Sequence, residues 1–266
     1  MIAGRRVTLK SRSQIEQMRH AGRIVADVLD LLAEQVRPGV TAADLDRMAD
    51  EFIRRAGATP SFIGVPGGGG LYRHATCISV DDEVVHGIQT GRRIEAGQIV
   101  SIDVGAIVNG WHGDAARSWV VGDAPPRSHE LVEATRQATI AGIRAATVGN
   151  HVWDISAAVE DVALAGRFGV VREYVGHGIG SEMHEEPPVP NYRTAGRGRR
   201  LEPGLCLAIE PMFTLGGHAC QVKGDGWTVH TADGSRASHW EETLAVMPDG
   251  PVVLTTNDPA AWHLST

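Results

Sequence analysis

Four segments of the chain carry apolar residues at helical intervals. The first run begins after Ser13, whose spacing to Glu16 is that of a capping box, and it stops at Pro38-Gly39. Its apolar positions are Ile15, Met18, Ile24, Val25, Val28, Leu29 and Leu32. A second helix is expected from about Thr41 to Gly57, with inward-facing Leu45, Met48, Ala49, Phe52 and Ile53. Two more helices are expected at about 128–146 and 152–168.

Shorter apolar runs predict strands, and these runs lie between and after the helical segments. The first group covers residues 76–80, 99–104, 106–108 and 118–121. A second group is expected near residues 170–174, 205–209, 228–230 and 242–246. The stretch from 60 to 70 is rich in glycine and is interpreted as a loop.

One pattern, Arg-Arg-apolar-Glu-x-Gly-x4-Ile-acid, occurs twice in the sequence. It runs from Arg92 to Asp103 and again from Arg199 to Glu210. The preceding helices repeat more weakly, with a glycine five residues before an Asp-apolar pair: Gly39 before Asp44-Leu45, and Gly149 before Asp154-Ile155. The repeat predicts a duplication, with two helix–helix–strand halves facing each other across a pseudo-twofold axis. Because both copies end in a carboxylate on a predicted strand, such a fold is suited to holding a cation.

Several acids and histidines stand in apolar or glycine-flanked contexts: His86, Asp103, Asp114, His177, His184, Glu210 and Glu241. An unpaired carboxylate in an apolar strand is costly, so each acid needs a cation or a proton. For any one of them, a salt bridge or a protonated buried acid explains the sequence equally well. Taken together, four carboxylates and the His177 imidazole favour a pair of Mn, Fe, Co or Zn ions.

The segment from 176 to 187 contains the highest density of such acids, histidines and glycines in the sequence. Glycines on both sides of His177 are expected to let the backbone approach a metal closely. His184 lies beyond a predicted turn, so one histidine can bind metal while the other faces substrate. Glu185 and Glu186 are interpreted as parts of a solvated turn or as support for the ligands. Histidines without comparable context are left out of the site: His20, His74, His129, His151, His218, His230 and His239.

Length, composition and net charge exclude several classes of protein. With 266 residues, 42% of them hydrophobic, the chain suits one large domain or two fused halves. A net charge of -7 gives no attraction to phosphate backbones, which disfavours a nucleic-acid function. The three cysteines include no CxxC pair, which fits a reducing cytosol. No apolar run approaches the ~20 residues of a membrane span, and the first ten residues lack the apolar core of a signal peptide. A cytoplasmic protein without a membrane partner is expected.

These motifs resemble the methionine aminopeptidases of type I, the bacterial type, which form subfamily A of peptidase family M24. The resemblance runs from the first predicted helix to Val246, and its segments are Glu83-Val84-Val85-His86-Gly87-Ile88, Ser101-Ile102-Asp103-Val104, Gly110-Trp111-His112-Gly113-Asp114-Ala115-Ala116, Gly176-His177-Gly178-Ile179-Gly180, His184-Glu185-Glu186-Pro187, Ile209-Glu210-Pro211-Met212 and Trp240-Glu241-Glu242-Thr243. It implies the α+β pita-bread fold, in which duplicated halves share a curved, mostly antiparallel sheet covered by helices. A single catalytic domain over 1–266 is expected, with a short arm at 1–12 and halves at about 13–124 and 125–250.

The same resemblance implies a role for each candidate metal ligand. Asp103 would chelate one divalent cation, and His177 with Glu210 would hold a second. Asp114 and Glu241 would bridge the two. The ions would be drawn from Co, Mn, Fe, Zn and Ni, and they would activate a bridging water.

Further roles implied by the resemblance concern the substrate. His86 and His184 would contact the scissile peptide and its developing oxyanion, and His86 would assist the leaving nitrogen. Glu210 would shuttle the proton from water. The pocket for the methionine side chain would be lined by Tyr72, Cys77, Met183 and Trp227, a soft wall that suits a thioether. The expected partners are nascent polypeptides that begin with Met and have a small second residue, with transient contact to the ribosome. The family is usually monomeric.

Other proteins of the same fold differ from this chain in recognisable sequence features. Prolidases and Xaa-Pro aminopeptidases share the five ligands but usually carry a large N-terminal domain, whereas about a dozen residues precede the first helix here. Creatinase-like members need no metal, and the non-catalytic, proliferation-associated relatives tend to lose ligands. No long insertion separates His184 from Glu210, which favours type I over type II. Two departures bear on substrate preference and metal affinity: Met183 replaces a usual aromatic residue, and Glu242 replaces a common histidine.

Overall fold

The structure is a computed structural model that describes residues 7–258. Residues 1–6 and 259–266 lie outside the described part. Half of the predicted N-terminal arm, and most of the segment tested for a signal peptide, therefore lie outside it too. The described arm, residues 7–11, leads into α1 (Arg12–Ala33).

The first two helices are those expected from the apolar pattern. α1 begins at a capping box made by Ser11 and Gln14, so the predicted box at Ser13 and Glu16 was wrong by two residues. Ser11 has the extended backbone that a cap requires and its hydroxyl accepts from the Gln14 amide, whereas Ser13 already lies inside the helix. α2 (Ala42–Arg55) is capped by Thr41 and ends just before Gly57, whose φ is +79°.

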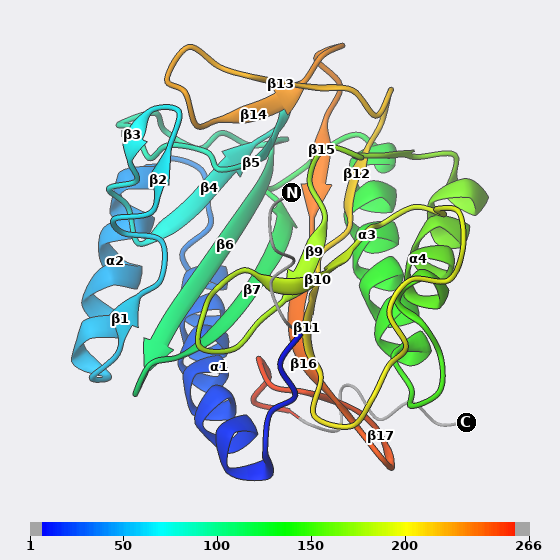
Figure 1. The fold of residues 1–266 in the computed structure, drawn as a ribbon. Helices are drawn as coiled ribbons and strands as arrows, with labels where there is room; N and C mark the ends of the chain where they lie inside the picture. Colours follow the sequence, from blue (N-terminus) through cyan, green and yellow to red (C-terminus); the bar gives the residue numbers. More distant parts are fainter. Residues whose placement is uncertain (1–6, 259–266) are drawn as a thin grey trace.

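The second pair of helices also lies close to its predicted bounds. α3 (Pro126–Ala145) begins at a proline, which suits the first helical position because its missing N–H is not needed there. α4 (Val152–Gly166) is followed by Arg167 in the left-handed region, with φ of 56°. In Figure 1, α1 and α2 lie on one side of the molecule and α3 and α4 on the other, with the strands between them.

A nine-stranded sheet with antiparallel neighbours joins the two sides. Its main path runs in the order β1 (Thr59–Pro60), β6 (Ile99–Val108), β7 (Trp111–Val120), β16 (Glu241–Met247), β11 (Cys206–Ile209), β9 (Gly176–Gly178) and β10 (Glu185–Val189). Two more strands pair at its flanks: β4 (Thr76–Val80) with β6, and β17 (Gly250–Val253) with β16. Helices that pack on an antiparallel sheet make the α+β class that was expected.

The strand predictions differ from the structure mainly around β6 and β7. The two runs at 99–104 and 106–108 form one continuous strand, and β7 begins at Trp111 rather than at residue 118. The strands are joined by Asn109-Gly110, both with positive φ (51° and 79°), which is the residue pair typical of a two-residue hairpin turn. The Asn-Gly dipeptide in the sequence therefore indicates a hairpin turn at this point, with β7 beginning directly after it.

Small sheets complete the described fold, and several of their strands were not predicted. They contain β8 (Gly169–Val170), β12 (Met212–Thr214) and β15 (Ala237–His239) in one sheet, β5 (Glu83–Val85), β13 (Cys220–Val222) and β14 (Val229–Thr231) in another, and the hairpin of β2 (Pro66–Gly67) and β3 (Gly70–Leu71). The interpretation of residues 60–70 as a plain loop was therefore wrong, because this stretch includes β2 and the start of β3.

The repeated sequence pattern makes the same backbone contacts in both halves. The residue before each helix bridges the repeated Arg-Arg segment, in the pairs Thr41 with Arg93 and His151 with Arg200. The repeated glycine also donates to the end of a paired strand in each half: Gly97 to the Val121 carbonyl (2.6 Å) and Gly204 to the Val246 carbonyl (2.9 Å). The duplication inferred from the sequence is thus present in the fold, and it places Asp103 and Glu210 at related positions.

Candidate metal centre and substrate cavity

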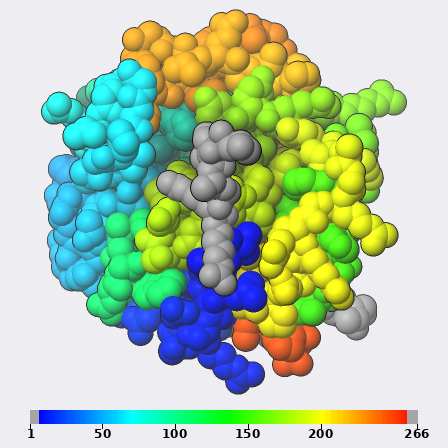
Figure 2. Space-filling view, in the orientation of Figure 1, coloured from blue at the N-terminus to red at the C-terminus, as the bar shows by residue number. Residues whose placement is uncertain are grey.

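A cavity of about 580 Å³ lies between the two halves and takes lining residues from both. The lining includes all seven acids and histidines that were singled out in the sequence. Figure 2 shows this face hollowed between the cyan segment near β2 and β3 and the yellow-green segments of the second half. The orange strands β13 and β14 stand above the hollow in the same view.

Five neighbouring strands of the large sheet each bring one candidate ligand to this cavity. Asp103 lies on β6, Asp114 on β7, Glu241 at the start of β16, Glu210 directly after β11, and His177 on β9. The register aligns them, since Ala116 is the cross-strand partner of both Asp103 and Glu241, and Ala208 is the partner of His177. Since side chains alternate between faces, Asp114 lies on the same face as its neighbour two residues on, Ala116.

Burial and mutual repulsion govern the protonation of these acids. Burial raises the pKa of Asp103 to about 7. For Asp114 and Glu241, burial comes first and the charges of the neighbouring acids add to it, so both pKa values lie well above the usual range. The pKa of Glu210 is raised in the same direction by burial and by Asp103. Without a cation, the cluster therefore holds protons near neutral pH.

Unpartnered atoms test whether the residues fit a metal ion. Within the described residues, Asp103 Oδ1, Asp114 Oδ1 and Glu241 Oε1 are buried without a hydrogen-bond partner. One set of potential ligand atoms, from Asp114, His177 and Glu241, lies within 4.8 Å of one another. Buried polar atoms are nearly always paired, so converging oxygens of this kind fit a divalent cation.

His177 presents its second ring nitrogen to this cluster. Its Nδ1 lies 3.0 Å from the Gly178 carbonyl, which can only accept, so Nδ1 carries the proton. The lone pair is then on Nε2, which lies 3.4 Å from Glu210 Oε1. Burial lowers the pKa of His177 to about 3, with the neighbouring His184 adding to the effect. His177 is therefore a neutral imidazole with a nitrogen available to a metal.

The glycines beside His177 have a packing role that the sequence did not predict. A Cβ at Gly176 would lie 2.4 Å from the Ala208 carbonyl oxygen, and one at Gly178 would lie 2.2 Å from that of Glu186. These atoms belong to or border the strands on either side of β9. The glycines therefore allow close approach of neighbouring backbones, and their expected role in letting the backbone approach a metal stays a prediction.

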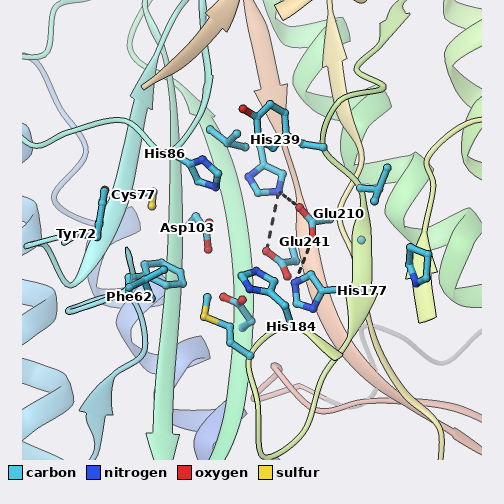
Figure 3. A pocket seen from close by; sticks show the side chains of 18 of the residues that line it. Phe62, Tyr72, Cys77, His86, Asp103, His177, His184, Glu210, His239 and Glu241 are labelled. Carbon is cyan, nitrogen blue, oxygen red and sulfur yellow. Dashed lines mark ion pairs between the residues drawn. The ribbon is translucent and has the colours of Figure 1, made fainter. Parts of the chain in front are cut away.

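The two remaining histidines flank the carboxylates (Figure 3). The His184 ring lies 4.4 Å from that of His177, edge to face. His86 has a φ of 58°, a conformation that is uncommon for a residue other than glycine. Burial, with His184 adding to it, lowers the pKa of His86 to about 4. A neutral His86 can donate an N–H toward the cavity.

Apolar and aromatic side chains form a pocket next to the acids. The four predicted residues Tyr72, Cys77, Met183 and Trp227 pack together with Phe62, which the sequence interpretation missed. The Tyr72 hydroxyl is within hydrogen-bond distance of two carbonyls, those of Thr76 (3.0 Å) and Gly87 (2.9 Å). Its ring meets Trp227 edge to face at 5.0 Å. These contacts fix the Tyr72 and Trp227 rings as one wall of the pocket, next to the segment that carries His86.

Glu185 belongs to a buried ion pair and not to a solvated turn. Lys10 Nζ lies 2.5 Å from Glu185 Oε2, and the two side chains are 2% and 10% exposed. Thr8 donates to the same carboxylate oxygen at 2.7 Å. The described end of the N-terminal arm therefore holds the segment that carries Met183 and His184.

His239 is the site residue that the sequence interpretation left out. It lies at the end of β15, is 2% exposed, and points Nε2 toward Glu210 Oε2 (3.8 Å) and Glu241 Oε2 (4.0 Å). Figure 3 shows it above the two carboxylates. The signal in the sequence was its spacing, because a residue two positions before Glu241 faces the same side of an extended chain.

Carboxylates and histidines that converge in a buried cavity define a candidate hydrolytic metal centre, and comparison with known proteins agrees. The chain belongs to metallopeptidase family M24, whose model matches residues 16–248. It is 44% identical to the methionine aminopeptidase of Clostridium acetobutylicum over 250 residues, 94% of this chain and 98% of that protein. It is 46% identical to methionine aminopeptidase 1 of Mycobacterium tuberculosis over 262 residues, 96% and 97% of the two chains.

Solved structures show the same fold. The crystal structure of methionine aminopeptidase from Thermotoga maritima superposes with a TM-score of 0.91 at 40% identity, covering 95% of this chain and all of that one. The prolidase of Pyrococcus furiosus superposes with a TM-score of 0.74 at 22% identity, and the match covers 66% of that longer chain. The second likeness concerns the fold alone. The pita-bread fold expected from the sequence is therefore confirmed.

Proposed function

We propose that this protein is a methionyl aminopeptidase, which removes the initiator methionine from new polypeptides whose second residue is small. The observation that carries the proposal is one cavity that joins the acid and histidine cluster to the soft pocket around Cys77 and Trp227. The relatives named methionine aminopeptidase, at 44% and 46% identity over nearly the whole chain, support it.

The proposed metal centre holds two divalent cations from among Co, Mn, Fe, Zn and Ni. Asp103 would bind one ion, His177 with Glu210 would bind the other, and Asp114 and Glu241 would contribute to both. Support comes from the unpartnered oxygens and from the neutral His177 imidazole. The bound ions would supply the Lewis acidity that makes water a nucleophile near neutral pH and polarises the substrate carbonyl.

The remaining steps fall to side chains in the cavity. Glu210 takes the proton of the attacking water at a carboxylate oxygen, as a general base. His184 donates to the developing oxyanion, the interaction that usually contributes most in acyl transfer. His86 assists the leaving amide nitrogen. Tyr72, Cys77, Met183, Trp227 and Phe62 exclude water from the methionine side chain.

The setting of this reaction is the cytoplasm, where polypeptide N-termini emerge. The proposed partners are nascent chains that begin with Met, with a transient contact to the ribosome. None of the described helices is long and apolar enough to cross a membrane. A single domain of two halves, at about 13–124 and 125–250, is proposed to work as a monomer.

The variants Asp103→Asn and Glu210→Gln test this assignment. With metal supplied, each is expected to lose activity on a Met-Ala peptide by on the order of a hundredfold or more, because one removes a ligand charge and the other a proton acceptor. Glu34→Gln, at the exposed end of α1, is the control and should retain full activity. Full activity in either site variant would rule the assignment out.

A further inference from the structure

We infer that His239 is a further ligand of the metal centre, supplying an imidazole nitrogen to the ion held by Glu210 and Glu241. This inference rests on the proposed function, because it concerns the same site. None of the ligand roles implied by the family resemblance includes His239.

The first observation is the unpartnered nitrogen. His239 Nε2 is fully buried and has no hydrogen-bond partner in the described part of the chain. Burying a ring nitrogen without a partner is costly, because the nitrogen gives up its hydrogen bonds to water and gains none in return. An imidazole so placed therefore needs a hydrogen-bond partner or a cation in front of it, and the nearest side-chain atoms are carboxylate oxygens that also bind cations.

The second observation is the distance to the two carboxylates. Nε2 lies 3.8 Å from Glu210 Oε2 and 4.0 Å from Glu241 Oε2, both too long for hydrogen bonds. Two donors that each lie about 2.1 Å from one ion are separated by roughly 3–4 Å. Glu210, His239 and Glu241 also each offer one ligand atom to a set within 4.8 Å of one another, which differs from the set of Asp114, His177 and Glu241.

The third observation is the arrangement around Glu210. Its Oε1 faces His177 Nε2 at 3.4 Å and its Oε2 faces His239, so the carboxylate stands between two imidazoles. His239 is also held firmly, because Ser118 Oγ donates to its carbonyl (2.7 Å) and accepts from its amide (3.1 Å). A fixed backbone and a converging nitrogen are what a ligand position requires.

Counting bound imidazoles tests the inference directly. X-ray absorption spectra of the Co(II)-loaded protein should show two imidazoles per protein, from His177 and His239, and one in His239→Gln. This count in the unaltered protein needs no variant, so it holds even if a substitution impairs folding. One imidazole in the unaltered protein, with two Co(II) bound, would overturn the role of His239 and leave the proposed function standing.

Metal affinity gives the second readout. Calorimetric titration of His239→Gln with Co(II) should show one of the two equivalents bound at least about tenfold more weakly, with the other unchanged. His230→Gln is the matched control, since His230 lies on β14 outside the cavity lining. Circular dichroism of the metal-free variants checks folding. Unchanged affinity and imidazole count in a folded His239→Gln would refute the inference, whereas failure of the unaltered protein to bind metal would refute the proposed function as well.

Discussion

At the scale of single residues, the site brings together side chains and a backbone conformation that each reduce the stability of the fold. Asp114 and Glu241 are 3% and 2% exposed, and each repels the other in its charged form. His86 adds a backbone in the left-handed region, which costs on the order of 1–3 kcal/mol. An apolar residue in place of each buried acid would cost less free energy on folding. Stability therefore does not explain these groups, and function does.

Proton release on metal binding follows from the raised pKa values. Below its folded-state pKa of about 7, Asp103 holds a proton, and the pKa values of Asp114, Glu210 and Glu241 are also raised. A cation must displace these protons, so affinity should fall as pH falls through 7, and binding at pH 7 should release about one proton or more. Calorimetry in two buffers of different ionisation enthalpy measures the number. Equal heats in both buffers would contradict the account.

At the scale of elements, short segments hold the substrate-facing residues in place. The arm at residues 7–11 fixes the connection between β9 and β10 through Lys10 and Glu185. The hairpin of β2 and β3 packs its glycines on the Trp227 indole. Neither segment contains a candidate ligand, yet each supports one wall of the cavity.

Lys10→Met is expected to disturb His184 without touching the metal centre. Removing one partner of a buried pair leaves Glu185 uncompensated, which should cost roughly 3 kcal/mol of stability. We expect kcat/KM to fall about tenfold while Co(II) affinity stays unchanged. Steady-state kinetics, calorimetry and urea unfolding measure these quantities. The double variant Lys10→Met/Glu185→Met should regain most of the stability, and unaltered kinetics in a folded Lys10→Met would show that the ion pair does not position His184.

Gly69→Ala tests the wall made by the hairpin. A Cβ at Gly69 would lie 2.3 Å from Trp227 Cδ1 and 2.4 Å from the Asp225 carbonyl oxygen, so the indole must move. KM for Met peptides should rise about tenfold with kcat little changed, because the change acts on binding of the side chain. Gly91→Ala is the control, since no atom lies within 4 Å of its Cβ. An unchanged KM in Gly69→Ala would mean that Trp227 does not shape the pocket.

At the scale of the whole molecule, the duplication is the feature that the sequence predicted best. The repeated pattern ending at Asp103 and Glu210 predicted two related halves with acids at their centre, and equivalent backbone contacts are found in both. Long helices were predictable because their apolar period extends over many residues. Strands such as β12 and β15 contain three residues each, too few to show a period. The spacing of His239 to Glu241 was the one local signal for it, and its approach to Glu210 was not predictable because that depends on how β15 packs.

The most direct test of the central claim is peptide selectivity after metal is removed and restored. The protein would be stripped with chelator and assayed on Met-Ala-Ser, Leu-Ala-Ser and Ala-Pro-Ala, with and without Mn(II) or Co(II). The account predicts release of Met from the first peptide only, absent after stripping and regained with metal. Cleavage of Ala-Pro-Ala in its place would assign the protein to the prolidase branch, and no cleavage with metal bound would contradict an enzymatic role.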